Sequence, residues 1–173
     1  MFFYDRKTHE LQQEVWNAFY QTTDENEKRE LKAKIDEYEQ VLCHAGEIAY
    51  VECEKTFPRI SKDLVALFKD GVFHDSVIDK VEIKKFRTSK LPRVMIHVSF
   101  DTQHGRCRGV MIYDQVSRFC YEDTFTSHYT HFECLENEFF YRDGIGFTHN
   151  YLLQKDDLSE LSVTCGTVKW KKR

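Results

Sequence analysis

The sequence contains little proline and glycine, and it has no long apolar run. Its 173 residues include 2 Pro and 7 Gly, which leaves little material for a flexible linker. No apolar stretch approaches the roughly 20 residues that a helix needs to cross a bilayer. The first three apolar residues are followed at once by charged ones, unlike a signal peptide. The sequence therefore predicts an intracellular, cytoplasmic protein of one domain, with or without a helical extension.

The spacing of the cysteines excludes two common kinds of site. No two of the six cysteines are separated by two residues, so neither a zinc ribbon nor a thioredoxin-type redox site is indicated. The chain is also longer than the small secreted domains that depend on disulfides. We expect reduced, mostly buried thiols, with Cys53, Cys120 and Cys165 in apolar or β-branched surroundings. No cofactor, stoichiometric metal or intramolecular disulfide is expected.

Charge is unevenly distributed along the chain. Residues 1–70 carry 15 acidic and 10 basic side chains, whereas residues 71–173 carry 14 and 15. An acidic helical half disfavours binding to nucleic acid, which depends on neutralising phosphates. The basic terminus, residues 169–173, is interpreted as a charged tail that aids solubility. We expect a protein partner, with no nucleic acid and no membrane.

The hydrophobic period changes at residues 71–76. Before this point apolar residues recur at helical spacing, and after it they alternate as in strands. Helices first and strands second predict an α+β fold, with N-terminal helices packed on one face of a mostly antiparallel, meandering sheet. We place a helical region at 1–70 and a β-rich region at 71–173, together forming one compact unit.

Local signals give approximate element bounds. A first helix is expected from Thr8 to Tyr20, and a second after a capping-box-like start at Asp24 and Glu27. Residues 48–57 fit either a continuation of that helix or a short strand, and we favour helix. Ser61 should cap a short helix over 62–69. The expected strands are 77–86, 94–101, 108–113, 119–126, 139–142, 147–153 and 161–170.

Several short strings resemble a group of uncharacterised bacterial proteins. They are the opening at residues 2–6 before an amphipathic helix, the pair His74-Asp75 before a strand, Glu138-Phe139, and the stretch from 152 to 163. In that group a helical front end precedes a β-rich domain that a His-Asp pair introduces. The resemblance implies such a fold in a bacterial, cytoplasmic protein, and it implies no site.

Two sets of residues could carry metal chemistry. His128, His131 and Cys134 have the ligand types that zinc uses, although neither a strand nor a helix gathers all three. His74-Asp75 invites comparison with metal-dependent phosphohydrolases, but an Asp at a strand entrance commonly binds the turn backbone. Neither set matches a catalytic motif. A metal-assisted hydrolase is therefore kept as the alternative function.

Aromatic residues are dense in the second half of the chain. Eleven Phe or Tyr residues lie between positions 113 and 151, more than one sheet face would bury. We predict that the surplus forms a partner-binding surface, represented by Tyr121, Phe125, Tyr129 and Phe132. The expected function is a non-enzymatic interaction protein, for example an antidote (immunity) protein or an adaptor.

The alternation in residues 94–101 generates a stability prediction. If Val94, Ile96, Val98 and Phe100 face the core, Ile96→Ala should cost about 2–5 kcal/mol of unfolding free energy. His97 and Ser99 would then face outward, and His97→Ala should cost little. Chemical denaturation of both variants checks this, and equal losses would show that both faces of the sheet are covered.

Overall fold

A computed structural model describes the chain except residues 1–5, 86–89, 103–104, 122–131 and 155–157. It divides into two compact units, residues 1–51 and 52–173. The boundary lies within the second helix, whereas the sequence places the division at residue 70. No helix among the described residues is long and apolar enough to cross a membrane.

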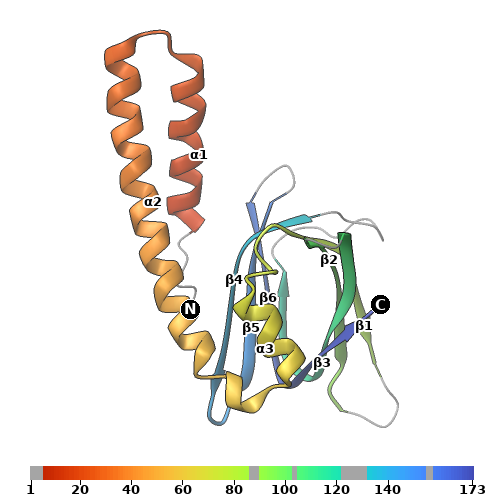
Figure 1. The fold of residues 1–173 in the computed structure, drawn as a ribbon. Helices are drawn as coiled ribbons and strands as arrows, with labels where there is room; N and C mark the ends of the chain where they lie inside the picture. The colour runs from red at the N-terminus through yellow and green to blue at the C-terminus, as the bar shows by residue number, and fades with distance from the viewer. Residues whose placement is uncertain (1–5, 86–89, 103–104, 122–131, 155–157) are drawn as a thin grey trace. The chain divides into compact units, whose positions relative to one another are not determined.

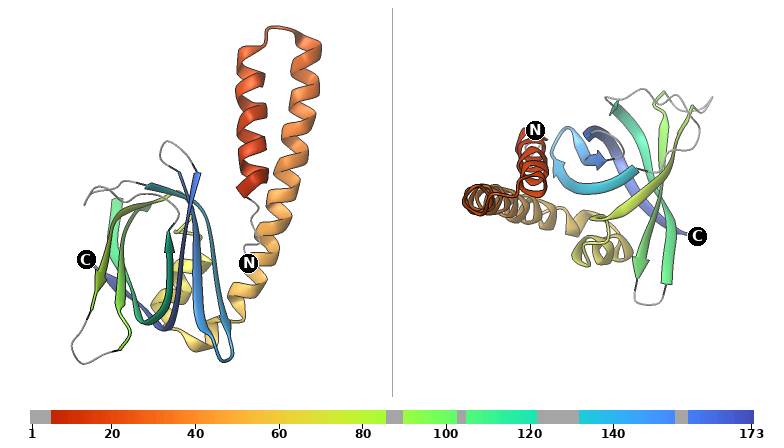
Figure 2. Two further views of the ribbon diagram at one scale, coloured as in Figure 1. Left: turned by 180° about the vertical axis from the view of Figure 1, so that it is seen from behind. Right: turned by 90° about the horizontal axis from the view of Figure 1, so that it is seen from above.

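The first unit is a helical hairpin. Helix α1 (Arg6–Gln21) lies side by side with α2 (Glu25–Glu54), which continues into the second unit (Figures 1 and 2). The apolar stripe of α2 includes Ile35, which is fully buried. Residues 48–54 are helical, as favoured from the sequence, and Gly46 does not end the helix.

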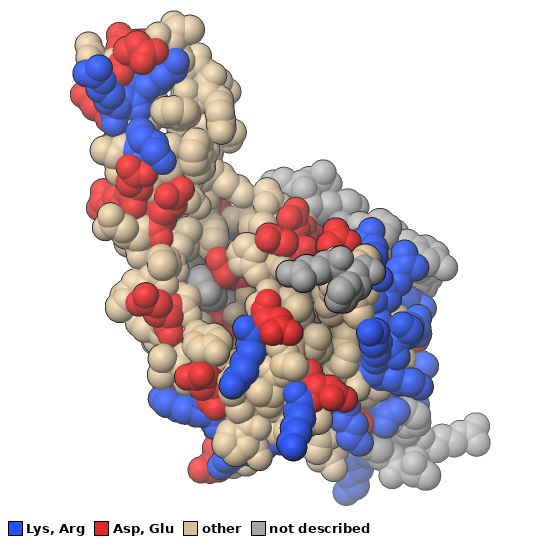
Figure 3. Space-filling model, viewed as in Figure 1, with Lys and Arg blue, Asp and Glu red and all other residues tan. Residues whose placement is uncertain are grey.

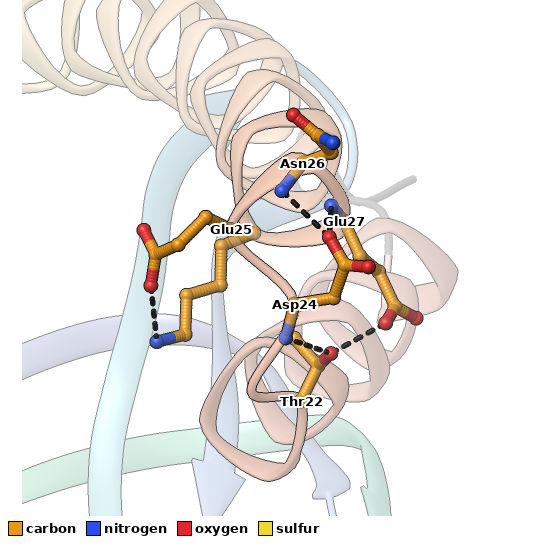
Figure 4. Close-up of polar contacts among 6 residues, drawn as sticks. Thr22, Asp24, Glu25, Asn26 and Glu27 are labelled. Atoms are coloured by element: carbon orange, nitrogen blue, oxygen red, sulfur yellow. Dashed lines mark hydrogen bonds and ion pairs between the residues drawn. The ribbon is translucent and has the colours of Figure 1, made fainter.

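Short-range hydrogen bonds fix the start of α2 (Figure 4). Asp24 Oδ1 accepts from the backbone N–H groups of Asn26 at 2.8 Å and Glu27 at 3.2 Å. The Thr22 hydroxyl donates to Glu27 and accepts from the Asp24 N–H at 3.3 Å. These bonds satisfy N–H groups that a helix leaves unpaired at its N-terminus. They confirm the predicted helix start.

A short helix links the hairpin to the sheet. A 3-10 turn (Phe57–Arg59) precedes α3 (Lys62–Lys69), whose N-cap Ser61 accepts from the Leu64 N–H, as predicted. Phe68 of α3 stacks on Phe139 of the sheet with ring centroids 4.7 Å apart. Helix α3 therefore packs against the sheet, and the α+β class is confirmed.

The sheet closes into a six-stranded barrel in the order β1-β2-β3-β6-β5-β4. Two antiparallel meanders, β1-β2-β3 and β4-β5-β6, are joined where β3 pairs with β6 and where β4 pairs with β1. The second junction is short and involves residues 76–78 and 132–134. The strands are β1 (Ser76–Lys84), β2 (Arg93–Thr102), β3 (Gly105–Tyr121), β4 (Phe132–Arg142), β5 (Gly146–Gln154) and β6 (Leu158–Lys172).

Strand β3 corrects the sequence-based assignment. The predicted strands at 108–113 and 119–126 are parts of one strand of 17 residues, Gly105–Tyr121. Gln115 takes a positive φ of 57°, and the pairing with β6 shifts register between Val116 and Arg118. A bulge bends a strand without ending its pairing. The polar residues in the middle of β3 therefore mark a bend, not a loop.

Alternating side chains fill the barrel. Val94, Ile96 and Val98 are at most 1 % exposed and Phe100 is 6 % exposed, which confirms the predicted core face of β2. Side chains from all six strands join them in one hydrophobic cluster that also includes Phe68 of α3. A barrel of this size has an interior that side chains can fill.

One close contact inside the barrel sets a steric prediction. A Cβ added at Gly109 would lie 2.1 Å from Cζ2 of Trp170, on the neighbouring strand. Because the indole is packed against the core, Gly109→Ala should destabilise the barrel by about 1–3 kcal/mol. The loss should shrink in a Trp170→Leu background, measured by urea denaturation as a double-mutant cycle. If Gly109→Ala lowers the free energy of unfolding equally in the wild type and in Trp170→Leu, a clash with the indole is not the cause.

A candidate partner-binding face on the barrel

The predicted metal ligands are not assembled by the residues that the structure describes. His128 and His131 lie outside the described residues, and the rest of the described chain holds no cluster of three His, Cys, Asp or Glu side chains suited to a metal. Cys134 is fully buried, and its thiol donates to the Glu136 carbonyl oxygen at 3.3 Å. Burial raises the pKa of Cys134 far above the usual thiol value. Burial therefore favours the protonated thiol of Cys134 in the described barrel.

The other cysteines are also unpaired. Cys53 and Cys165 are buried, as predicted, and burial raises the pKa of each thiol to about 12. Cys120 is exposed, contrary to the prediction, because it points to the outer side of β3. Its apolar neighbours in sequence face the barrel instead.

His74 and Asp75 form part of the turn between α3 and β1. Their side chains pair at 2.9 Å and are largely exposed. The Asp75 N–H donates to the Cys134 carbonyl oxygen at 2.8 Å, which extends the short β1-β4 junction. Asp75 has a φ of 60°, a conformation that asparagine and aspartate tolerate better than most residues. These contacts support the structural interpretation of the pair.

The predicted aromatic surface is only partly described. Phe125 and Tyr129 lie outside the described residues. Phe132 is 5 % exposed within the barrel core, and Tyr121 meets it edge to face with centroids 6.1 Å apart. Phe132 is therefore not part of an exposed patch, because its position on β4 faces the barrel interior. The partner-binding role of the wider segment stays a prediction.

A polar cluster lies inside the barrel. His149 Nδ1 lies 2.7 Å from the Tyr113 hydroxyl and 2.9 Å from the Tyr151 hydroxyl, and the two hydroxyls are 2.5 Å apart. All three residues are fully buried. The rings of Phe68 and Phe139 lie 5.6 and 5.2 Å from the imidazole. Burial lowers the pKa of His149 well below its usual value.

Hydrogen-bond accounting selects the tautomer of His149. If Nδ1 is unprotonated, Tyr113 donates to it and Tyr151 donates to Tyr113, so both hydroxyl hydrogens are used. The remaining donor is the Nε2–H, which has no hydrogen-bond partner in the described part of the barrel. Protonation at Nδ1 would instead leave one hydroxyl donor and the Nε2 acceptor unused. The neutral imidazole is therefore hydrogen-bonded within the packed interior of the barrel.

Five cations share the outer side of β3 and β6, and we call them the basic face. Lys169 and Lys171 alternate along β6 with Trp170, which packs against the core, and so point outward. Arg106 and Arg108 alternate in the same way on β3. The Arg173 N–H donates to the Arg108 carbonyl oxygen at 2.9 Å, which continues the pairing to the end of the chain. Figure 3 shows Lys and Arg side chains gathered on this part of the barrel.

This arrangement corrects the interpretation of residues 169–173 as a charged tail. Residues 169–172 belong to β6 and are hydrogen-bonded to β3 in a fixed register. Alternate residues of a strand lie about 6.6–6.8 Å apart on one side of the sheet. The charges are therefore held on a rigid surface. The period-2 spacing of Lys169, Lys171 and Arg173 is a signal of this in the sequence, although it does not reveal the neighbouring strand.

Most cations of the basic face have no carboxylate partner among the described residues. Arg106 donates to the Ser99 hydroxyl at 3.0 Å, and Arg108, Lys169, Lys171 and Arg173 are exposed without an ion pair. On β1 and β2 several cations have carboxylate partners, because Arg93 pairs with Asp114 and Glu82 is shared by Lys80 and Lys84. The basic face thus holds four exposed cations without an ion pair among the described residues, and Asp101 stands opposite Arg106 in the register with β2.

Apolar side chains lie between the charges of the basic face. Val110 stands beside Lys171 and Ile112 beside Lys169 in the β3-β6 register, and Met95 of β2 faces Ile112. Val110 is 4 % exposed, whereas Ile112 and Met95 are partly exposed. Apolar centres with polar or arginine-rich surroundings are typical of protein interfaces.

His97 lies at the edge of this surface. It is on the outer side of β2, as predicted, but it is buried, and its Nε2 lies 2.7 Å from Glu82 Oε1. Burial and the positive charge of Arg173 lower the pKa of His97, and Glu82 opposes that shift. Partial burial works to raise the pKa of Glu82, but hydrogen bonds from Lys80 and His97 lower it. His97 thus differs from the solvent-facing residue predicted from alternation, because Glu82 of β1 lies against its imidazole on the outer side of the barrel.

Comparison with known proteins does not assign the chain to a family. No family model matches the chain, and neither a curated protein nor a solved structure matches it significantly.

The buried His149 predicts a pH dependence of stability. Its folded-state pKa lies well below the unfolded value of about 6.5, so below that pH only the unfolded chain gains the proton. The contribution of His149 to the free energy of unfolding should therefore be fully present above about pH 6.5. Below that pH it should fall by up to about 1.4 kcal/mol per pH unit. His97, whose pKa is also lowered, should add to the loss.

Denaturation at several pH values between about 7 and 5.5 measures this slope. His149→Phe should have a smaller slope than the wild type, whatever its absolute stability. His44→Gln, at an exposed position of α2, is the control and should keep the wild-type slope. An unchanged slope in His149→Phe would show that this imidazole is protonated in the folded barrel.

Proposed function

We propose that this chain is an interaction protein that binds an acidic protein surface through the basic face of its barrel. The observation that carries the proposal is the set of exposed, unpaired cations held in register around Val110 and Ile112. Because β3 pairs with β2 and residues 169–172 of β6 pair with β3, the cations are organised before binding. This is the interaction role expected from the sequence, assigned to a different surface.

The chemistry of the face favours a protein partner over a nucleic acid. A phosphate backbone needs cations but gains nothing from apolar side chains between them. An amphipathic acidic helix would use both parts, with carboxylates toward Lys169 and Lys171 and apolar residues toward Ile112 and Met95. The described aromatic residues of β3 and β6 face the barrel interior or its bend, so the face offers no ring on which bases could stack.

A defined probe tests the proposal with the full chain. The probe is a fluorescent amphipathic helix of about 20 Glu and Leu residues, compared with polyglutamate of equal charge and with a DNA duplex. The chain should bind the amphipathic helix at least about tenfold more tightly than either comparison probe, and binding should weaken with salt.

A matched charge reversal provides the control. Lys169→Glu with Lys171→Glu should weaken binding of the helix by about tenfold or more. Lys62→Glu with Arg118→Glu makes the same change in net charge at exposed positions outside the basic face and should bind like the wild type. Equal losses in both double variants, or tighter binding of DNA than of the helix, would contradict the proposal. Circular dichroism confirms that each variant is folded.

A further inference from the structure

One segment of the chain has the chemistry that the basic face would recognise. Between Lys34 and Lys55, helix α2 contains no Lys or Arg, and it contains six carboxylates. We call residues 35–54 the acidic segment. Its carboxylates belong to Asp36, Glu37, Glu39, Glu47, Glu52 and Glu54.

The acidic segment also exposes an apolar stripe. Val41 is 50 % exposed, Ile48 is 40 % exposed and Val51 is 52 % exposed. Spacings of seven and three residues place these side chains on one side of the helix. Ile35 and Ala49, which are at most 5 % exposed, belong to a different side. The helix therefore has a buried apolar stripe and a second, exposed one with carboxylates beside it.

We infer that the acidic segment of a second copy of this chain occupies the basic face. This inference rests on the proposed function and names its partner. The two surfaces are complementary, because cations surround Ile112 and Val110 on one and carboxylates such as Glu37 and Glu47 flank Val41 and Ile48 on the other.

The dimensions of the two surfaces also agree. Lys169 and Arg173 are four strand residues apart, about 13–14 Å. Val41 and Val51 are ten helical residues apart, about 15 Å. A helix laid along β6 could therefore place its carboxylates along the whole row of cations and its exposed apolar stripe beside them, toward Ile112.

The charge of the two units favours pairing between copies. Residues 1–51 carry 11 acidic and 6 basic side chains, whereas residues 52–173 carry 18 and 19. Each copy thus supplies one acidic hairpin and one barrel with a basic face. Two copies that exchange these contacts form a closed dimer with a two-fold axis, in which both kinds of surface are covered twice.

Sedimentation velocity of the full chain tests the inference. The wild type should form a dimer as its concentration rises, and the dimer should weaken between about 50 and about 300 mM salt. The face variant, Lys169→Glu with Lys171→Glu, should be monomeric. The helix variant, Glu37→Lys with Glu47→Lys, should be monomeric as well, because like charges would then oppose each other.

Mixing the two variants is the decisive measurement. The reversed face of one variant matches the reversed helix of the other, and their unaltered surfaces also match, so an equimolar mixture should form a heterodimer. Glu14→Lys with Glu39→Lys is the control for the helix variant, since Glu39 lies on the side of α2 opposite the exposed stripe. This control should dimerise like the wild type.

The outcomes separate the inference from the proposed function. The partner is not a second copy of this chain if the wild type stays monomeric at all concentrations. The same conclusion follows if the two variants do not associate when mixed. If such a chain still binds the Glu-Leu helix through Lys169 and Lys171, the acidic partner is a different protein and the proposed function holds. If it binds neither, both are refuted.

Discussion

The pairing of β3 with β6 is the interaction on which the rest of the second unit depends. It pairs two antiparallel meanders whose other strand pairing, within the described ranges, is the short β1-β4 junction. The pairing extends from Tyr121↔Leu161 to Gly109↔Lys172, with one register shift at the bend. Because side chains alternate along a strand, this register determines at once which residues fill the barrel and which face outward.

The interior of the barrel encloses several chemically reactive residue types. Cys134, Cys165 and His149 are surrounded by apolar and aromatic side chains, and burial disfavours the charged forms of thiols and imidazoles. The hydrogen bonds between His149, Tyr113 and Tyr151 use most of their polar atoms within the core. Such a cluster can fix one packing arrangement of the interior.

The outer surface differs from the interior. Polar groups of the interior are largely hydrogen-bonded to one another, whereas several cations on the outside have no ion pair among the described residues. Glu82 and Asp114 pair with cations of β1 and β2, whereas Arg108, Lys169 and Lys171 of β3 and β6 are exposed without an ion pair. Holding like charges close together costs free energy that the barrel has to offset. An acidic partner would remove this cost, and the acidic segment of α2 has both the charge and the exposed apolar side chains to do so.

The sequence alone determined the local structure. Apolar periodicity and capping residues predicted the helices, including the Asp24 and Ser61 caps, and alternation predicted the core face of β2. These signals act over a few residues, so they are present in any short stretch of the chain. Tertiary structure alone decided that β3 is one bent strand, that the sheet closes, and that residues 169–173 extend a strand beside Arg106 and Arg108. Those features depend on pairing between segments about forty to sixty residues apart. No local pattern specifies which strands become neighbours.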